Sequence, residues 1–97
     1  MMILHTVKTS PFQTLAIEHC LNLLSEQDSL LLMEDAVIAS AAPHSCFEQL
    51  RLLAEQKRLY VLQADLDARA IENRIGTKCS YLDFVNLVIA HKSQLAW

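Results

Sequence analysis

The chain has 97 residues, of which 53% are hydrophobic, and this length predicts a single small domain spanning residues 1–97. Its formal net charge of −3 and its scattered Lys and Arg residues argue against direct nucleic-acid binding, because neutralising phosphates requires clustered positive charge. It has no apolar stretch near the roughly 20 residues that span a bilayer, and no signal-peptide pattern, so we expect a cytoplasmic protein without a membrane segment.

The first elements in the chain are a strand and a helix. Residues 3–7 are rich in β-branched side chains and predict a strand. Ser10, Pro11 and Gln13 have the pattern of a helix start, with Ser10 as the cap, and the helix is expected to run to about residue 25. One apolar stripe is expected to face the core, formed by Phe12, Ala16, Cys20, Leu23 and Leu24.

Residues 29–33 predict the central strand of the fold. Leu30 to Met33 are four consecutive apolar residues without alternation, which is typical of a strand buried on both faces. Glu34 and Asp35 follow at the carboxyl end of this strand, where the functional groups of open α/β sheets collect. They could act as an acid–base pair, but the simpler interpretation is that Asp35 caps a short helix extending to residue 41.

The second half of the chain continues the alternation of helices and strands. Its expected elements are helices at 46–56, 66–72 and 82–91 and strands at 59–62, 78–81 and 93–97. Ser45 and Glu48 have capping-box spacing at the start of the first of these helices, and Asp65 is a candidate cap for the second. The inward face of the last helix is expected to comprise Phe84, Val85, Val88 and Ile89.

This order of elements predicts an α/β fold with three layers, α/β/α, and a mostly parallel five-stranded sheet. Gly76 is the single glycine, and tight hairpin turns depend on glycine, so helical connections between parallel strands are favoured. The apolar segments 37–42 and 85–90 are candidates for an interface with another subunit, because so small a domain cannot cover all its apolar surface.

The three cysteines, Cys20, Cys46 and Cys79, are widely spaced and form no C-x-x-C motif, so neither a zinc site nor a disulfide framework is indicated. Cys20 lies on the apolar stripe of the first helix, and spacing alone favours a structural role for it. Cys46 lies in the first turn of a predicted helix, where the dipole lowers a thiol pKa. No metal-binding histidine spacing and no phosphate-binding glycine loop occurs, so we expect no metal or cofactor.

Several stretches, taken in order, resemble the DsrH/TusB family of sulfur-relay proteins. They are Ile3–Val7 with Ser10-Pro11-Phe12, Leu30–Val37 with Ala39, Leu59–Leu62 with Asp65-Leu66 and Ala68-Arg69, Asp83–Val85 with Leu87, and Gln94–Trp97. The chain departs from the family at Ala36 and Ala70, where glycine is expected in many members. The resemblance implies a DsrE-like fold and a hetero-hexamer with two homologous small subunits, DsrE/DsrF-like or TusD/TusC-like, and a downstream sulfur-acceptor protein.

The residues and the resemblance leave three functions open. The resemblance implies an accessory, non-catalytic subunit of a sulfurtransferase complex that delivers persulfide sulfur for 2-thiolation of the tRNA wobble uridine, with the sulfur-carrying cysteine on a partner. The alternative is a DsrH-type subunit of a dissimilatory sulfur-oxidation complex, in which Cys20 is itself the sulfur carrier, as DsrH-branch members resemble this chain in having a cysteine there. A flavodoxin-like small-molecule binding module is the third, and the missing glycine loops count against it.

Overall fold

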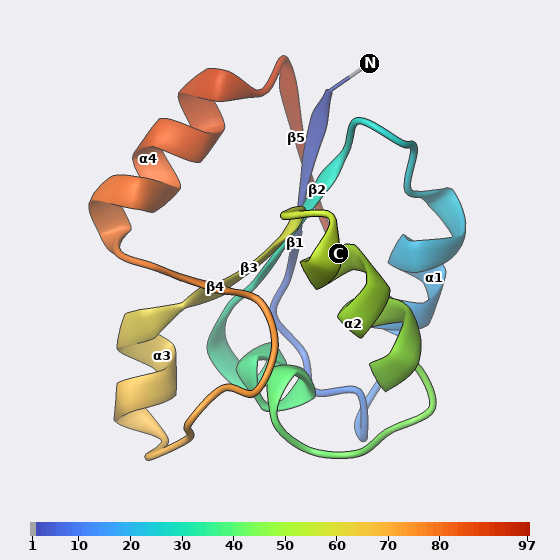
Figure 1. Ribbon diagram of the computed structural model, residues 1–97, viewed down its shortest axis with the longest axis vertical. Coiled ribbons are helices and arrows are strands. Elements are labelled where there is room, and N and C mark those ends of the chain that lie inside the picture. The colour runs from blue at the N-terminus through green and yellow to red at the C-terminus, as the bar shows by residue number, and fades with distance from the viewer. Residues whose placement is uncertain (1) are drawn as a thin grey trace.

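The computed structural model describes residues 2–97 and contains one five-stranded sheet in the order β4-β3-β2-β1-β5 (Figure 1). Its strands are β1 (Ile3–Val7), β2 (Ser29–Leu32), β3 (Leu59–Leu62), β4 (Thr77–Cys79) and β5 (Ser93–Ala96). Every pair of neighbouring strands is parallel. The predicted α/β fold is therefore confirmed.

The helices cover the two faces of this sheet unequally. They are α1 (Ala16–Leu23), the 3-10 helix η1 (Glu34–Ser40), α2 (Phe47–Glu55), α3 (Gln63–Ala68) and α4 (Tyr81–Ala90). Helices α1 and α2 lie on one side of the sheet, whereas α4 lies on the opposite side (Figure 1). No helix within residues 2–97 is long and apolar enough to cross a membrane.

Strand β2 is buried on both faces, as its continuous apolar run predicts. Leu30 and Leu32 belong to the larger core cluster, which also contains residues of α1 and α2. Leu31 points the other way and joins a smaller cluster to which Phe84 and Leu87 of α4 contribute. All three leucines have no exposed surface, so the alternation along one strand divides the core into two layers.

The predicted start of the first helix is wrong. The Ser10 side chain accepts a hydrogen bond from the Phe12 backbone N–H at 3.1 Å, but this closes a turn, and the helix begins only at Ala16. Because a turn replaces the first part of the predicted helix, Phe12 does not join the core-facing stripe and is 63% exposed. Leu23, at the end of α1, is also exposed. Ile17 and Cys20 alone provide the fully buried side chains of α1.

The side-chain caps predicted for three other helices are also wrong. The first residues of η1, α2 and α3 are preceded by residues that make no side-chain cap hydrogen bond. Asp35 lies inside η1, Ser45 precedes the N-cap of α2, and Asp65 lies inside α3. The capping box that does form joins Ser80 and Asp83 at the start of α4, a Ser-x-x-Asp spacing that the sequence contains.

Asp28 ties the turn before β2 to the start of β1. Its carboxylate accepts hydrogen bonds from the backbone N–H groups of Ile3 at 2.9 Å and Ser25 at 3.0 Å. It also lies 3.0 Å from Nε2 of His5, and both side chains are buried. Burial raises the pKa of Asp28, but the hydrogen bonds from His5, Ser25 and Ile3 outweigh it and hold the pKa below 3.8.

Two residues in the connection between α3 and β4 have positive φ angles. Gly76 has a φ of +88°, and a Cβ there would meet Val61 at 3.1 Å and Leu59 at 3.2 Å. Ala70, one of the two positions where the family resemblance implies glycine, has a φ of +51°. This conformation is the physical reason for a glycine preference at position 70.

Candidate functional site

Cys20, the residue predicted to carry sulfur, lies in α1 and faces the core. It has no exposed surface and belongs to the larger core cluster. Burial, together with the negative charge of Asp28, raises the pKa of the Cys20 thiol to about 12. Sulfur transfer needs a thiolate that a donor can reach, and this conformation provides neither the charge state nor the access.

The other two cysteines are enclosed as well. Cys46 precedes α2 and is 7% exposed. Cys79, at the end of β4, is 1% exposed, and its Sγ donates a hydrogen bond to the Ser80 carbonyl oxygen at 3.4 Å. Burial and then the charge of Asp83 raise the pKa of Cys79 to about 11. Across residues 2–97, all three cysteine thiols are therefore buried rather than presented at the surface.

The carboxyl edge of the sheet carries charged side chains that neutralise one another. Arg69 pairs with Asp35 at 3.0 Å and with Asp65 at 3.7 Å. Asp65 also accepts a hydrogen bond from the Glu34 backbone N–H at 2.6 Å, which holds η1 against α3. Arg69 engages the carboxylates of Asp35 and Asp65, and the Glu34 carboxylate lies 4.0 Å from Nζ of Lys8. This edge therefore has the properties of a structural ion-pair network rather than an acid–base pair. Within residues 2–97 no cluster of three His, Cys, Asp or Glu side chains could hold a metal ion.

Helix α4 presents a broad apolar surface to solvent. Its outward side chains include Leu82 at 69%, Val85 at 52% and Ile89 at 77% exposure. None of its residues is fully buried, and only Phe84 and Leu87 pack against the smaller core cluster. The prediction that Val85, Val88 and Ile89 point inward is therefore wrong, because the sheet contacts only one side of a helix that is apolar on several sides.

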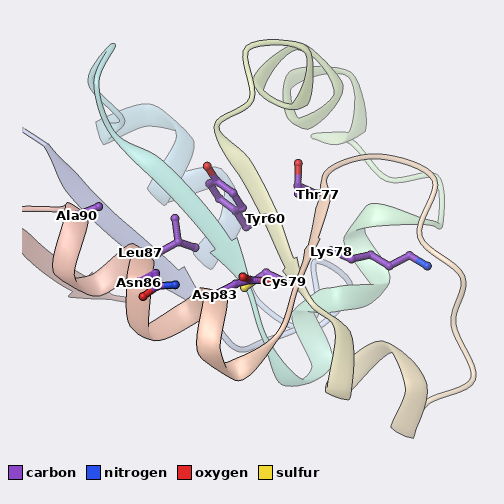
Figure 2. Close-up of a pocket in the computed structure, with 8 residues that line it drawn as sticks. All are labelled: Tyr60, Thr77, Lys78, Cys79, Asp83, Asn86, Leu87 and Ala90. Carbon is purple, nitrogen blue, oxygen red and sulfur yellow. The ribbon is translucent and has the colours of Figure 1, made fainter.

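A groove of about 410 Å³ separates α4 from the edge of the sheet. Tyr60, Cys79 and Leu87 are among its lining residues, and Figure 2 shows Leu87 directed toward the strands while Lys78 extends away from α4. Strand β4 is the edge strand here, so its outer backbone groups have no strand partner within the described sheet. The outer face of α4, this groove and the β4 edge form one continuous candidate docking surface, hereafter the α4 surface.

The other predicted interface segment does not belong to this surface. Ala36, Val37, Ala39 and Ser40 of η1 are completely buried within the chain itself. The small side chains of η1 suggested close approach to a partner. They instead allow η1 to pack within the chain, against β3 and α3. Three residues of the predicted interface segment 37–42, Val37, Ala39 and Ser40, are therefore closed to a partner, whereas 85–90 lies on the α4 surface.

Comparison with known proteins identifies relatives along nearly the whole chain. The family described as DsrH like protein matches residues 9–94. Protein TusB from Escherichia coli O81 is 40% identical, and the match covers 97% of this chain and 99% of the relative. Protein TusB from Pectobacterium parmentieri is 37% identical with the same coverage, and that from Klebsiella pneumoniae is 39% identical.

A solved structure agrees with the fold. The crystal structure of the ychN protein from E. coli superimposes with a TM-score of 0.78 and covers 100% of both chains, at 20% sequence identity. At that identity the likeness concerns the fold alone. It supports the three-layer arrangement of parallel strands and helices described above.

Proposed function

This chain belongs to the DsrH family, and from that membership we propose that it is a subunit of a sulfur-relay complex that delivers persulfide sulfur for 2-thiolation of the tRNA wobble uridine. The observation that carries the proposal is the match to relatives named TusB at 37–40% identity over nearly the full length of both chains. The protein is thus one of several small subunits of a hetero-oligomer. The family membership also explains the α/β fold, so the third function, a flavodoxin-like small-molecule binding module, is not needed to explain it.

Within this complex the chain contributes to the structure and binds its partner subunits, whereas a neighbouring subunit carries the transferable sulfur. The burial of Cys20, Cys46 and Cys79 supports this division of roles, because none is available to a donor in the folded chain. The α4 surface also supports this division of roles, because burying its exposed apolar side chains against a partner subunit is favourable.

The finer organisation follows from the family resemblance. The partners are two homologous small subunits, TusD/TusC-like, with two copies of each subunit in a hetero-hexamer. A downstream acceptor protein receives the sulfur, and the complex works in the cytoplasm with residues 1–97 of this chain acting as one domain. Sedimentation analysis of the co-purified complex measures this stoichiometry.

The function is tested by deletion and rescue. A strain without this chain is expected to lose 2-thiouridine from the tRNA wobble position, measured by mass spectrometry of tRNA nucleosides, and a plasmid copy is expected to restore it. Cys20→Ser, Cys46→Ser and Cys79→Ser copies are expected to rescue as well as the wild type, provided their proteins accumulate equally. Unchanged thiolation in the deletion strain would reject the proposal.

The alternative, in which Cys20 carries sulfur in a sulfur-oxidation complex, requires Cys20 to be reactive rather than buried and inert. It requires α1 to move so that a thiol with a pKa of about 12 becomes accessible and ionised. Mass spectrometry after incubation of the complex with a cysteine desulfurase and a persulfide donor separates the two. Added sulfur on Cys20 supports the alternative, whereas sulfur confined to a partner subunit supports the accessory role.

A further inference from the structure

We propose that Trp97, His5 and Asp28 form a proton-sensitive latch that holds the end of the C-terminal strand against β1, and that proton uptake by His5 releases Trp97. The three side chains form one chain of hydrogen bonds. The Trp97 indole N–H donates to Nδ1 of His5 at 3.0 Å, and Nε2 of His5 lies 3.0 Å from Oδ2 of Asp28. The latch joins residues from both ends of the sequence and is separate from the docking role proposed above.

The hydrogen-bond partners select one form of the imidazole. An indole N–H can only donate, so Nδ1 of His5 accepts and carries no proton. The ionised carboxylate of Asp28 can only accept, so Nε2 carries the ring proton. His5 in the latch is therefore neutral, and the one position left for a second proton is the Nδ1 atom that Trp97 occupies.

Few other charged groups surround His5, so few could offset a positive charge on its ring. Asp28 stays ionised because the N–H groups of Ile3 and Ser25 also donate to it. Arg58 donates to the backbone oxygen of Asp28 at 2.7 Å, and Cys20 of α1 lies near enough to feel the Asp28 charge but remains a thiol. The strands on either side of β1 have the sequences SLLL and SQLA and add no titratable side chain.

Protonation of His5 acts on the two ends of the latch in opposite ways. The imidazolium keeps its bond to Asp28, and the pair gains charge attraction. At Nδ1 the new N–H faces the N–H of Trp97, so that hydrogen bond is lost. The Trp97 indole is the component able to move, because it is only partly buried and follows β5, an edge strand whose side chains are exposed. The backbone N–H of Trp97 still donates to the Thr6 carbonyl oxygen at 2.8 Å, so release concerns the side chain.

The latch is tested by nuclear magnetic resonance of the full chain, labelled with ¹⁵N-tryptophan and ¹⁵N-histidine and assembled with unlabelled partner subunits. The chain has one tryptophan, so a single labelled indole resonance reports on the latch. We expect the Nε2–H tautomer of His5 at neutral pH and, on acidification, a change of the Trp97 indole resonance with the same midpoint as the His5 titration. A Trp97 resonance that does not follow His5 would overturn the proposal.

Two variants distinguish a latch from simple packing. Trp97→Phe keeps an aromatic ring but removes the N–H that stabilises neutral His5, so the His5 titration midpoint is expected to move to higher pH than in the wild type. His19→Gln removes an exposed histidine outside the latch and is expected to leave both midpoints unchanged. An unchanged His5 midpoint in folded Trp97→Phe contradicts the latch, and if that variant does not fold, the coincidence of midpoints in the wild type decides.

Discussion

At the scale of single residues, Ala70 stores conformational strain that a glycine would remove. A left-handed conformation costs an L-residue about 1–2 kcal/mol, and glycine avoids this while losing some entropy on folding. We therefore expect Ala70→Gly to raise the free energy of unfolding by about 0.5–1 kcal/mol, measured by chemical denaturation. The position has φ +51° and is exposed, so no core packing is lost.

Ala36→Gly provides the matched control for Ala70→Gly. Ala36 is the other position where the family resemblance implies glycine, but it is completely buried and does not have a positive φ. Its replacement is expected to lower stability by about 1 kcal/mol through lost packing and added chain entropy. Equal destabilisation by the two substitutions would contradict the strain argument.

Asp28 makes folding stability depend on pH. Its pKa is lowered in the folded state, so its contribution is complete above the ordinary value of 3.8 and is lost as the pH falls through the lower folded value. Asp28→Asn is expected to destabilise the chain by about 2–4 kcal/mol at neutral pH, because backbone donors and His5 lose a charged acceptor.

The same substitution gives a pH signature. In denaturation curves measured from pH 7 downward, the difference between wild type and Asp28→Asn should shrink below about pH 4 as the wild-type carboxylate becomes protonated. Glu48→Gln changes an exposed carboxylate paired with Arg51 and serves as the comparison. A constant difference across the pH range would show that Asp28 acts through shape rather than charge.

At the scale of secondary-structure elements, the order and type of the elements and the bounds of α2 and α4 could be predicted from the sequence, whereas the starts of α1 and α3 and most helix caps could not. Strand β2 was predictable because four apolar residues without alternation have one simple explanation in an α/β chain. Capping signals were less informative, because serine and aspartate at Ser10, Asp35 and Asp65 can serve turns or ion pairs equally well. Tertiary contacts decide among these uses, as the Arg69 pairs with Asp35 and Asp65 show.

The candidate site was only half predictable for a related reason. The segment 85–90 was identified as interface from its composition, yet the same residues were also expected to face inward. The two expectations conflict, and only the position of α4 against one face of the sheet decides which side chains remain outside. The contact between Trp97 and His5 spans 92 positions and has no local signal at all.

The role of α4 leads to a prediction about partner binding. Ile89 is 77% exposed on the α4 surface and contributes to neither core cluster. Ile89→Asp is expected to leave folding intact while weakening the co-purification of partner subunits at least tenfold, because a charge would be buried in an apolar interface. The measurement is a pull-down quantified by mass spectrometry.

Leu23→Asp is the control for Ile89→Asp. Leu23 is 64% exposed, but it ends α1 on the other side of the sheet. This substitution makes the same change of size and charge at a comparable exposure, and we expect it to leave partner binding unchanged. Loss of binding in Leu23→Asp with retention in Ile89→Asp would place the interface on the opposite face of the molecule.

At the scale of the whole molecule, the two sides of the sheet differ in how well the chain covers them. One side has α1 and α2 above a core cluster with many fully buried side chains. The other has α4 alone over four buried residues, Leu4, Leu31, Leu62 and Cys79. A chain of this length with 53% hydrophobic residues has more apolar surface than it can enclose, and the excess is concentrated on α4.

This asymmetry predicts how the chain behaves with and without its partners. Leu82, Val85 and Ile89 remain in water when the chain is alone, and burying them is favourable by about 25 cal/mol per Å² of apolar surface. We therefore expect the isolated chain to self-associate or aggregate at micromolar concentration and to become stable when co-expressed with its homologous partners. The permanent interface should bury more than about 2,000 Å² in total and be more apolar than ordinary surface.

Light scattering and size-exclusion chromatography measure this association directly. If the α4 surface drives it, Ile89→Asp should keep the isolated chain monomeric at concentrations where the wild type and Leu23→Asp both form larger species. The same substitution then weakens association in both settings, because it places a charge on the apolar surface that self-association and partner binding both use. A wild-type chain that stays monomeric and binds no homologous subunit would contradict the docking role and, with it, the place of this chain in a hetero-oligomer.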